Sequence, residues 1–393
     1  MKDLPEGWVD VRLGDFAKTE KGKKPKVLSS ERTEACPIPY VNIKAFEKNV
    51  IDEYTDGKGC VICEDDDFLM VWDGSRSGYV GKAIKGALGS TLVRIKFPNV
   101  NHDYAYFFLQ SKFVEINTRA KGVGIPHVDP NLVWNYRFPL PPLPVQHAIV
   151  TKIEEIFSEL DHGVEQLKTA QQQLKVYRQA VLNSAILGNA EHTIESVIAS
   201  LDQGWSPKCY NEASRNNEEW AVIKTTAVQA GYFLDEENKK LPEDLEPRKQ
   251  HELKQGDLLI TRAGPRVRVG VCCLIKKTRS RLLNCDKVYR MRINPSKAIP
   301  EYIEILLNSP KYSKEVEKMK TGISDSGVNL TQKGFLKILI PLPPLSEQHQ
   351  IVAEIERRLS VCDKLEETIV ESLKAAEVLR AGVLKRAFEG QLV

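Results

Sequence analysis

The chain has 393 residues, of which 42% are hydrophobic and 28% charged, a balance that excludes a disordered or an integral membrane protein. Its 56 basic and 53 acidic residues leave a net charge of only +3, so the overall charge indicates no class of partner. No run of 18 apolar residues occurs, and residues 1–8 lack the apolar core of a signal peptide. We therefore expect no membrane contact and a cytoplasmic location.

A first globular segment is predicted over residues 1–142, where short alternating apolar runs indicate a strand-rich, mixed α/β domain. The stretch 40–43 resembles a strand, and 67–74 resembles a strand that enters a glycine turn. The stretch 104–111 resembles a short helix. Lysines cluster early in this segment, at Lys21, Lys23, Lys24 and Lys26.

A long helix is predicted over residues 143–190, because prolines precede it, Gly188 follows it, and apolar residues recur in steps of three and four. About 40 residues at 1.5 Å each give a length of roughly 60 Å. Packing against its own domain is one interpretation, but a long single-striped helix usually needs a long partner. The predicted contact positions are Ile149, Ile153, Ile156, Leu160, Leu167, Leu174, Tyr177 and Val181.

A second globular segment is predicted over residues 191–344, again of mixed α/β character. Its landmarks correspond in order to those of the first segment, and they are 222–224, 257–264 and 302–309. Outside these landmarks the two segments have diverged heavily. Cys272 and Cys273 lie in an apolar run, so we expect them in the core of a strand.

A second long helix is predicted over residues 345–393, and Gly390 ends it. The obvious partner of this helix is the first one, so we expect an antiparallel coiled coil. Its predicted contact positions are Ile351, Ile355, Leu359, Cys362, Leu365, Ile369, Leu373, Ala376, Leu379 and Val383.

An internal repeat connects these four segments. The stretches Pro139–Glu154 and Pro341–Glu356 are identical at 11 of 16 positions, at a constant offset of 202 residues. Both contain a Pro-Leu-Pro-Pro-Leu run followed by Gln-His at the start of the helix. The paired histidines recur without a nucleophile or a carboxylate, so we interpret them as helix-start or inter-subunit contacts. The chain is therefore a tandem duplication with a pseudo-twofold repeat.

Enzyme chemistry finds little support in the motifs. The run 74–83 has six residues between its outer glycines, whereas a phosphate loop needs four and a hydroxyl after the lysine. Cys60 and Cys63 have metal-ligand spacing but no second pair, so we expect ordinary thiols and no metal. A nuclease-like set can be forced onto Asp244 and 252–254, but 252–257 fits better as a turn before a strand. We assign no catalytic residue.

Local charge is more informative. The stretch from Arg262 to Arg292 holds ten basic residues and one acidic residue, Asp286. Basic residues beside glycine turns suit phosphate neutralisation, and arginines also read guanine edges in the major groove. Solvated surface charge is the alternative for each residue. The candidate DNA contacts are Arg76, Arg262, Arg266, Arg268, Lys44, Lys121 and Lys24.

Together these features resemble the specificity (S) subunit of type I restriction-modification systems. The resemblance is carried by Leu4–Trp8 near the start, by Pro139–Glu154 and Pro341–Glu356, and by the strand and turn at 256–264. With the repeat, it covers essentially the whole chain. It implies two target recognition domains, at 1–142 and 191–344, that alternate with two spacer helices, at 143–190 and 345–393.

The resemblance also implies a function without catalysis. Each recognition domain would read one half of a bipartite target in double-stranded DNA, and the helices would set the spacing at roughly one duplex turn, about 34 Å. Two methyltransferase subunits would dock on the two similar helices, and restriction subunits would join for cleavage. No cofactor is expected in this chain, because S-adenosylmethionine, ATP and magnesium would belong to the partners.

Two other functions stay open. An enzyme fragment with an unseen catalytic motif would bind a cofactor as the isolated chain. A stand-alone DNA-binding regulator would dimerise through its helices, although a chain with two reading domains has no need to dimerise.

Overall fold

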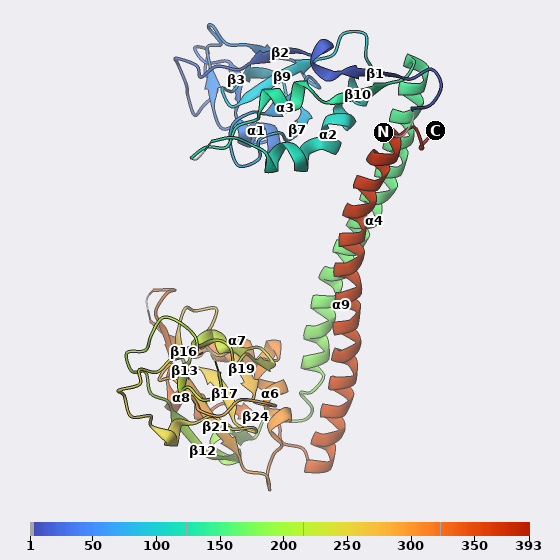
Figure 1. Cartoon of the computed structure of the whole chain (residues 1–393). Helices are drawn as coiled ribbons and strands as arrows, with labels where there is room; N and C mark the ends of the chain where they lie inside the picture. Colours follow the sequence, from blue (N-terminus) through green and yellow to red (C-terminus); the bar gives the residue numbers. More distant parts are fainter. Residues whose placement is uncertain (1–3, 123, 215, 323) are drawn as a thin grey trace. The chain divides into compact units, whose positions relative to one another are not determined.

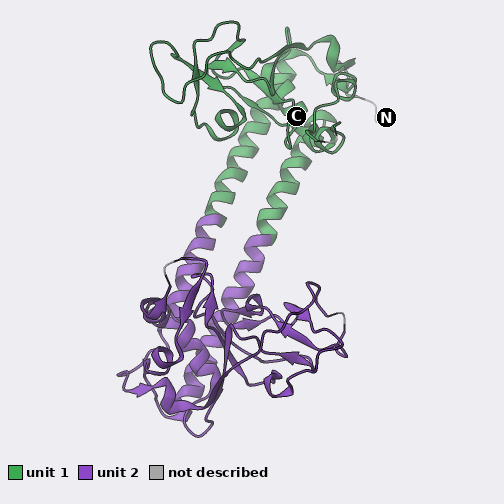
Figure 2. Cartoon of the chain, turned by 90° about the vertical axis from the view of Figure 1, so that its left-hand side faces the viewer, with its two compact units in different colours: residues 1–167, 371–393 green, residues 168–370 purple. Residues whose placement is uncertain are grey.

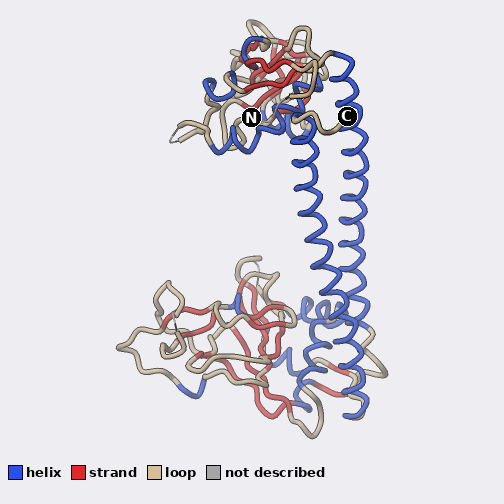
Figure 3. The backbone as a smooth tube through the Cα atoms, turned by 45° about the vertical axis from the view of Figure 1, so that its right-hand side comes forward, coloured by secondary structure: helices blue, strands red, loops and turns tan. Residues whose placement is uncertain are grey.

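The computed structural model describes residues 4–122, 124–214, 216–322 and 324–393, which form two compact units. Unit 1 comprises residues 1–167 and 371–393, and unit 2 comprises residues 168–370 (Figure 2). Each unit therefore contains one globular part and a portion of both long helices, and the strands lie in the globular parts (Figure 3). Within the described ranges, no helix is long and apolar enough to cross a membrane.

The globular part of unit 1 precedes the first long helix in sequence (Figure 1). Its strands are β1 (Val9–Arg12), β2 (Lys18–Lys21), β3 (Ile38–Val41), β4 (Tyr54–Thr55), β5 (Ile62–Cys63), β6 (Phe68–Val71), β7 (Val80–Lys82), β8 (Gly86–Leu88), β9 (Leu92–Lys96) and β10 (Arg137–Leu140). Its helices are η1 (Leu13–Asp15), α1 (Ile43–Lys48), α2 (His102–Thr118) and α3 (Pro130–Trp134), and the long helix that follows is α4 (Leu143–Asn183).

The globular part of unit 2 lies between the two long helices in sequence. Its strands are β11 (His192–Thr193), β12 (Ile198–Gln203), β13 (Ala221–Ile223), β14 (Val228–Gln229), β15 (Tyr232–Phe233), β16 (Asn238–Lys240), β17 (Leu258–Thr261), β18 (Ala263–Gly264), β19 (Cys272–Leu274), β20 (Leu282–Leu283), β21 (Val288–Ile293), β22 (Lys320–Thr321), β23 (Val328–Leu330) and β24 (Leu339–Ile340). Its helices are α5 (Ile194–Val197), η2 (Thr225–Ala227), η3 (Lys249–His251), α6 (Pro300–Asn308), α7 (Pro310–Met319) and α8 (Gln332–Leu336), and the second long helix is α9 (Leu345–Phe388).

The two globular parts have the same sheet topology. Unit 1 has an antiparallel sheet in the order β2-β9-β6-β7, and unit 2 has its counterpart in the order β12-β21-β17-β19. A second sheet in each unit contains a parallel pair, β3 with β8 in unit 1 and β13 with β20 in unit 2. The correspondence of 67–74 with 257–264 is confirmed, because β6 and β17 take the same place in their sheets.

The central strands β6 and β17 are apolar along most of their length because both of their faces are covered. Phe68 and Met70 belong to the core beside the long helices, whereas Leu69 and Val71 belong to the core of the second sheet. In unit 2, β17 divides its residues between two cores in the same alternating way. Alternate side chains of a strand point to opposite faces, so a continuous apolar run is needed here. Cys272 and Cys273 are buried in the neighbouring strand β19, as predicted.

A buried glutamine joins the start of each long helix to its globular part. In unit 1, the side chain of Gln146 accepts the Asn101 N–H (2.8 Å) and donates to the Pro141 carbonyl oxygen (2.8 Å). In unit 2, Gln348 accepts the Ile299 N–H at 3.0 Å. It also donates to the carbonyl oxygens of the proline run at residue 343 (2.8 Å) and of residue 297 (3.2 Å). The repeated Pro-Leu-Pro-Pro-Leu…Gln-His sequence is thus an anchor for the helix start, since these bonds satisfy backbone groups that would otherwise be buried unpaired.

Candidate nucleic-acid interface

The glycine turns predicted after β6 and β17 begin and end with glycines of similar φ in both units, although the second turn is two residues longer. Gly74 and Gly264 have φ of +129° and +139°, and Gly78 and Gly270 have φ of +90° and +89°. The N–H groups of Gly78 and Gly270 each donate to a carbonyl oxygen at the end of β6 or β17, at 2.7 Å in both units. Positive φ values favour glycine, so these positions explain why the turns keep their glycines while the residues between them differ.

The predicted arginines Arg76 and Arg268 occupy equivalent places on these turns, and both contact the segment that follows the parallel strand. The Arg76 guanidinium lies 3.2 Å from Glu47 and 4.0 Å from the centre of the Tyr79 ring. Arg268 donates to the carbonyl oxygens of Thr225 (2.8 Å) and of residue 228 (2.7 Å). The structure gives both side chains partners inside the protein, and their contact with DNA stays a prediction.

Two other predicted arginines, Arg266 and Arg262, differ in whether a carboxylate neutralises their charge. Arg266 forms ion pairs with Glu317 (2.6 Å) and Asp325 (2.9 Å), and these carboxylates raise its pKa. Arg262 donates from Nε to the carbonyl oxygen of Asp286 (2.6 Å), but it has no carboxylate partner among the described residues. Arg262 therefore retains its charge unpaired and at the same time fixes the backbone of the neighbouring turn.

The predicted lysines lie on the globular part of unit 1 and are spread over its surface. Lys44 pairs with Asp52 at 2.5 Å, and Lys121 pairs with Asp129 at 2.7 Å. The pKa of each of these aspartates is lowered, chiefly by the hydrogen bond from its lysine. Lys24 is exposed and has no carboxylate partner within the described part of the chain. Of the three lysines, only Lys24 presents an uncompensated charge.

Many of the basic residues between 262 and 292 are paired with acidic residues from other parts of the fold, so the net positive charge of this region is smaller than its sequence indicates. Arg290 is 5% exposed and is paired with Asp202 from β12. Arg292 is paired with Asp257 at 2.8 Å, and Lys276 is paired with a glutamate of α9 at 2.9 Å. Acidic residues distant in sequence therefore compensate much of the run, which linear charge counting does not reveal.

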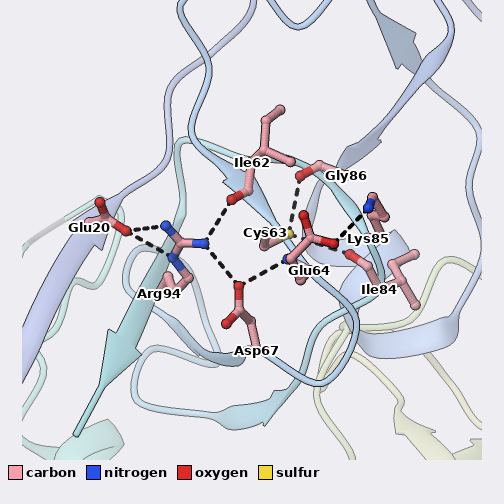
Figure 4. A network of polar contacts seen from close by, with 9 residues as sticks. All are labelled: Glu20, Ile62, Cys63, Glu64, Asp67, Ile84, Lys85, Gly86 and Arg94. Carbon is pink, nitrogen blue, oxygen red and sulfur yellow. Dashed lines mark hydrogen bonds and ion pairs between the residues drawn. The ribbon is translucent and has the colours of Figure 1, made fainter. Parts of the chain in front are cut away.

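The buried Arg290 and its half-buried counterpart Arg94 each join several segments of their main sheet. Arg94 donates to Asp67 (2.9 Å), to the Ile62 carbonyl oxygen (2.8 Å) and to Glu20 (2.9 Å), which joins three segments of the chain around one guanidinium (Figure 4). Burial alone would raise the pKa of Asp67, but the backbone N–H of residue 64 and Arg94 lower it. In unit 2, Arg290 makes the corresponding bonds to Asp202 and to the carbonyl oxygen of residue 252, and it also donates to the carbonyl oxygen of residue 250. Asp257, the counterpart of Asp67, pairs with Arg292 instead. These charge-assisted networks fix the strands from which the surface turns emerge.

A groove of about 530 Å³ lies beside Asp286 in unit 2. We call it the lysine groove, and the polar residues used to define it are Ser206, Lys208, Lys224, Lys239, Asp286 and Lys287. Lys224 lies 3.5 Å from Glu237. Lys208, Lys239 and Lys287 have no carboxylate partner among the residues that the structure describes. None of these three lysines is among the candidate contacts ranked from the sequence, although Lys287 belongs to the basic run 262–292 and Lys208 belongs to a Gly-x-x-Pro-Lys sequence that also occurs at 22–26.

Helices α4 and α9 pack antiparallel, as the pairing inside each unit shows. In unit 1, Arg380 pairs with Asp161, and in unit 2, Arg178 pairs with Asp363 at 2.7 Å. The two pairs exchange roles between the helices at the 202-residue offset, so they are equivalent under the pseudo-twofold repeat. Exposed ion pairs contribute little stability, typically about 0–1 kcal/mol each. The two reciprocal pairs nevertheless show which residues of α4 and α9 lie opposite one another.

The predicted contact positions of the two helices divide by burial. Those that are buried are Ile149, Ile153, Val181, Ile355, Cys362, Ile369 and Val383. Those that are half-buried are Ile156, Leu160, Leu167, Leu174, Ile351, Leu359, Leu373 and Ala376. Tyr177, Leu365 and Leu379 are 47–50% exposed and lie outside the contact, because a pair of helices covers only a narrow stripe of each partner.

Comparisons with known proteins agree with this duplicated architecture. The family model of the type I restriction modification DNA specificity domain matches residues 5–175 and again 208–375. The EcoEI specificity subunit of Escherichia coli is 42% identical over 172 residues, which are 44% of this chain and 29% of that relative. The MjaVIII specificity subunit of Methanocaldococcus jannaschii is 27% identical over 411 residues, covering 99% of this chain and 94% of the relative.

A solved structure of a type I restriction-modification system, concerned with its complex assembly and conformational transition, contains a chain of the same fold. It has a TM-score of 0.74 at 20% identity, and the match covers 100% of both chains. Because the family model matches well over half of the sequence, in two copies, the chain belongs to the family of type I restriction-modification DNA specificity subunits.

Proposed function

We propose that this chain is the non-catalytic DNA-recognition subunit of a type I restriction-modification enzyme. The observation that carries the proposal is the duplication of one fold on two different surfaces. The globular parts share sheet order and an arginine that pairs with the neighbouring strand, whereas the residues on their turns differ. Two such domains suit a bipartite target with two different half-sites, one read by each domain.

The partners follow from the same symmetry. The equivalent helix pairs, with reciprocal ion pairs, offer two similar docking places for one kind of partner, so we assign two methyltransferase subunits to each chain. Restriction subunits would join this complex for cleavage. The helices would act as the spacer between the half-sites, and S-adenosylmethionine, ATP and magnesium would be held by the partner subunits.

No group of three or more potential metal-ligating side chains is found in the described residues, and the prediction that the chain itself needs no cofactor remains to be tested. We expect the complex to act on chromosomal DNA in the cytoplasm.

Co-purification with the cognate methyltransferase subunit tests the proposal. A complex of two methyltransferases and one copy of this chain, with methylation confined to one bipartite sequence, is the expected result. The solution mass gives the stoichiometry, and methylation mapping gives the target. A chain that ignores the methyltransferase and binds DNA as a lone monomer or dimer would instead support the stand-alone regulator.

A further inference from the structure

The two globular parts share a turn directly after the first strand of the main sheet. Gly22 follows β2 and Gly204 follows β12, and each begins a Gly-x-x-Pro-Lys sequence. A Cβ atom at Gly22 would lie 2.2 Å from the carbonyl oxygen of Gly89, and one at Gly204 would lie 2.1 Å from that of Asn284. Such close backbone approach admits only glycine. The lysine that ends each turn is therefore held in an equivalent place, Lys26 in unit 1 and Lys208 in unit 2.

A second turn lies against the first and is also equivalent in the two units. It is closed by a hydrogen bond from its last N–H to its first carbonyl oxygen, 3.0 Å long at 89–92 and 3.2 Å long at 285–288. The two middle residues are Ser-Thr in unit 1 but Asp286-Lys287 in unit 2. The backbone is thus shared, whereas the chemistry that it presents is different.

A third position around the groove follows the same rule. Asn42 in unit 1 and Lys224 in unit 2 each stand at the start of the helix after the parallel strand, β3 or β13. Asn42 caps its helix through the Ala45 N–H, while Lys224 lines the lysine groove. All of these divergent positions border this one groove in unit 2.

The charged residues of the lysine groove suit a nucleic acid, which presents both phosphates and the hydrogen-bonding edges of bases. Three lysines carry no carboxylate partner among the described residues, and a free ammonium group neutralises a phosphate without base preference. The Ser206 hydroxyl donates a hydrogen bond to the Asp286 carboxylate and accepts one from the Asp286 backbone N–H (3.1 Å). The two bonds together orient the carboxylate. An oriented carboxylate is the side chain that accepts from the N4 amino group of cytosine.

We propose that the lysine groove is the DNA-contacting subsite of the second recognition domain. Lys208, Lys239 and Lys287 hold phosphates, and the Ser206–Asp286 pair reads a base edge. The corresponding turns of unit 1, with Lys24, Ser90 and Thr91, read the other half-site with different chemistry. This inference rests on the proposed function and assigns its specificity to one surface.

The test uses the full chain in complex with its methyltransferase subunit and a DNA library randomised in both half-sites. Asp286→Ser introduces the residue that unit 1 carries at the same backbone position, so the turn is retained. The expected result is a loss of preference of about tenfold or more at one base pair of one half-site, with the other half-site unchanged. The unchanged half-site is an internal control for folding.

Lys208→Ala and Lys287→Ala test the phosphate contacts. Each is expected to weaken binding of all sequences alike by several-fold and to lower the slope of log K against log salt by about one. Lys277→Ala is the matched control, because Lys277 is an exposed lysine of the same unit that does not line the groove.

Two results would overturn the inference. If Asp286→Ser selects the wild-type sequence with undiminished preference, and Lys208→Ala and Lys287→Ala bind like Lys277→Ala, the groove does not contact DNA, although the proposed function stands. If the wild-type complex shows no sequence preference in either half-site, the proposed function itself fails and the assignment of this groove fails with it.

Discussion

The globular parts of units 1 and 2 agree where the backbone is constrained and differ where side chains face solvent. Arg94 and Arg290 join equivalent strands, and Gly22 and Gly204 begin the same turn. The turn at residues 89–92 nevertheless presents different side chains from the turn at 285–288. A recognition domain of this kind can change its target without changing its fold, because the residues that stabilise it are separate from those that we assign to DNA.

The cores of the two units are built from different side chains on the same backbone architecture. In unit 1 the core beside the long helices is rich in aromatic rings, with Phe108 in contact with both Phe138 and Phe388. In unit 2 the corresponding core is mainly aliphatic, and Glu304 from α6 takes the place that Tyr106 has on α2. Both sets of core side chains fit the same backbone architecture, since a core needs the right volume more than a particular side chain.

The strongest test of the shared frame is Gly204→Ala. The new methyl group would meet the Asn284 carbonyl oxygen at 2.1 Å, so the junction of β12 and β21 must shift. We expect a loss of about 3 kcal/mol in the free energy of unfolding, the upper end of the usual range for overpacking, because the clash is with backbone. Thermal unfolding of the full chain measures this loss, and Gly22→Ala should reproduce it in unit 1.

Gly327→Ala is the matched control, because a methyl group at that position would have open space within 4 Å and the φ of Gly327 is not positive. Its effect should be within about 0.5 kcal/mol, as is usual for exposed surface substitutions. Equal melting temperatures for Gly204→Ala and Gly327→Ala would show that the turn is not constrained, and the equivalence of Lys26 and Lys208 would lose its basis.

Removing the anchor glutamines should be the next largest effect. Gln348→Ala deletes one accepted and two donated hydrogen bonds and leaves the Ile299 N–H unpaired, so we expect a loss of about 2–3 kcal/mol. Gln146→Ala deletes only two bonds and should cost less. Chemical unfolding of both variants tests the order, with exposed Gln173→Ala on α4 as the control. The reverse order would mean that hydrogen bonds do not determine the strength of these anchors.

The repeat, the long helices and the strand-turn landmarks could be predicted from the sequence, because each has a local signature. The offset of 202 residues identified Gln146 with Gln348, but it did not reveal that these side chains bind the helix starts of the globular parts. The role of Arg290 was also hidden. It was counted with the basic run, yet it is buried against Asp202, which lies 88 residues away in sequence.

The candidate site was the least predictable part for the same reason. Whether a lysine or arginine is free depends on acids brought near by folding, and only Lys24, Arg262 and Arg268 among the seven candidates lack a carboxylate partner in the described residues. The lysine groove combines segments around residues 206, 224, 239 and 286, which no window along the chain places together. The available signals for it were the Gly-x-x-Pro-Lys sequence at 22–26 and 204–208 and the place of Lys287 in the basic run 262–292.

A smaller effect should distinguish the two cores, through the pH dependence of stability. Burial raises the pKa of Glu304 to about 7, and the nearby carboxylates of Glu301 and Glu356 act in the same direction. The hydrogen bond from the Leu274 N–H (2.6 Å) and the charge of Lys276 oppose this rise, because both favour the ionised form. The folded state therefore holds a proton that the unfolded chain releases near its ordinary value of 4.5. The stability that this proton contributes is complete below about pH 4.5 and is lost as the pH rises to about 7.

Glu304→Gln should remove this dependence, because the amide cannot ionise but its oxygen can still accept the Leu274 N–H. We expect the variant to equal the wild type near pH 4 and to exceed it by about 2–3 kcal/mol near pH 8. Glu246→Gln in the same unit is the control, since Glu246 is exposed and is not among the groups that shift the pKa of Glu304. Unit 1 has Tyr106 in the corresponding position, and burial raises the pKa of its hydroxyl further above this range, so it adds no such dependence. A constant difference between Glu304→Gln and wild type from pH 5 to pH 8 would show that the carboxyl is already ionised in the fold, and the two cores would then differ in packing alone.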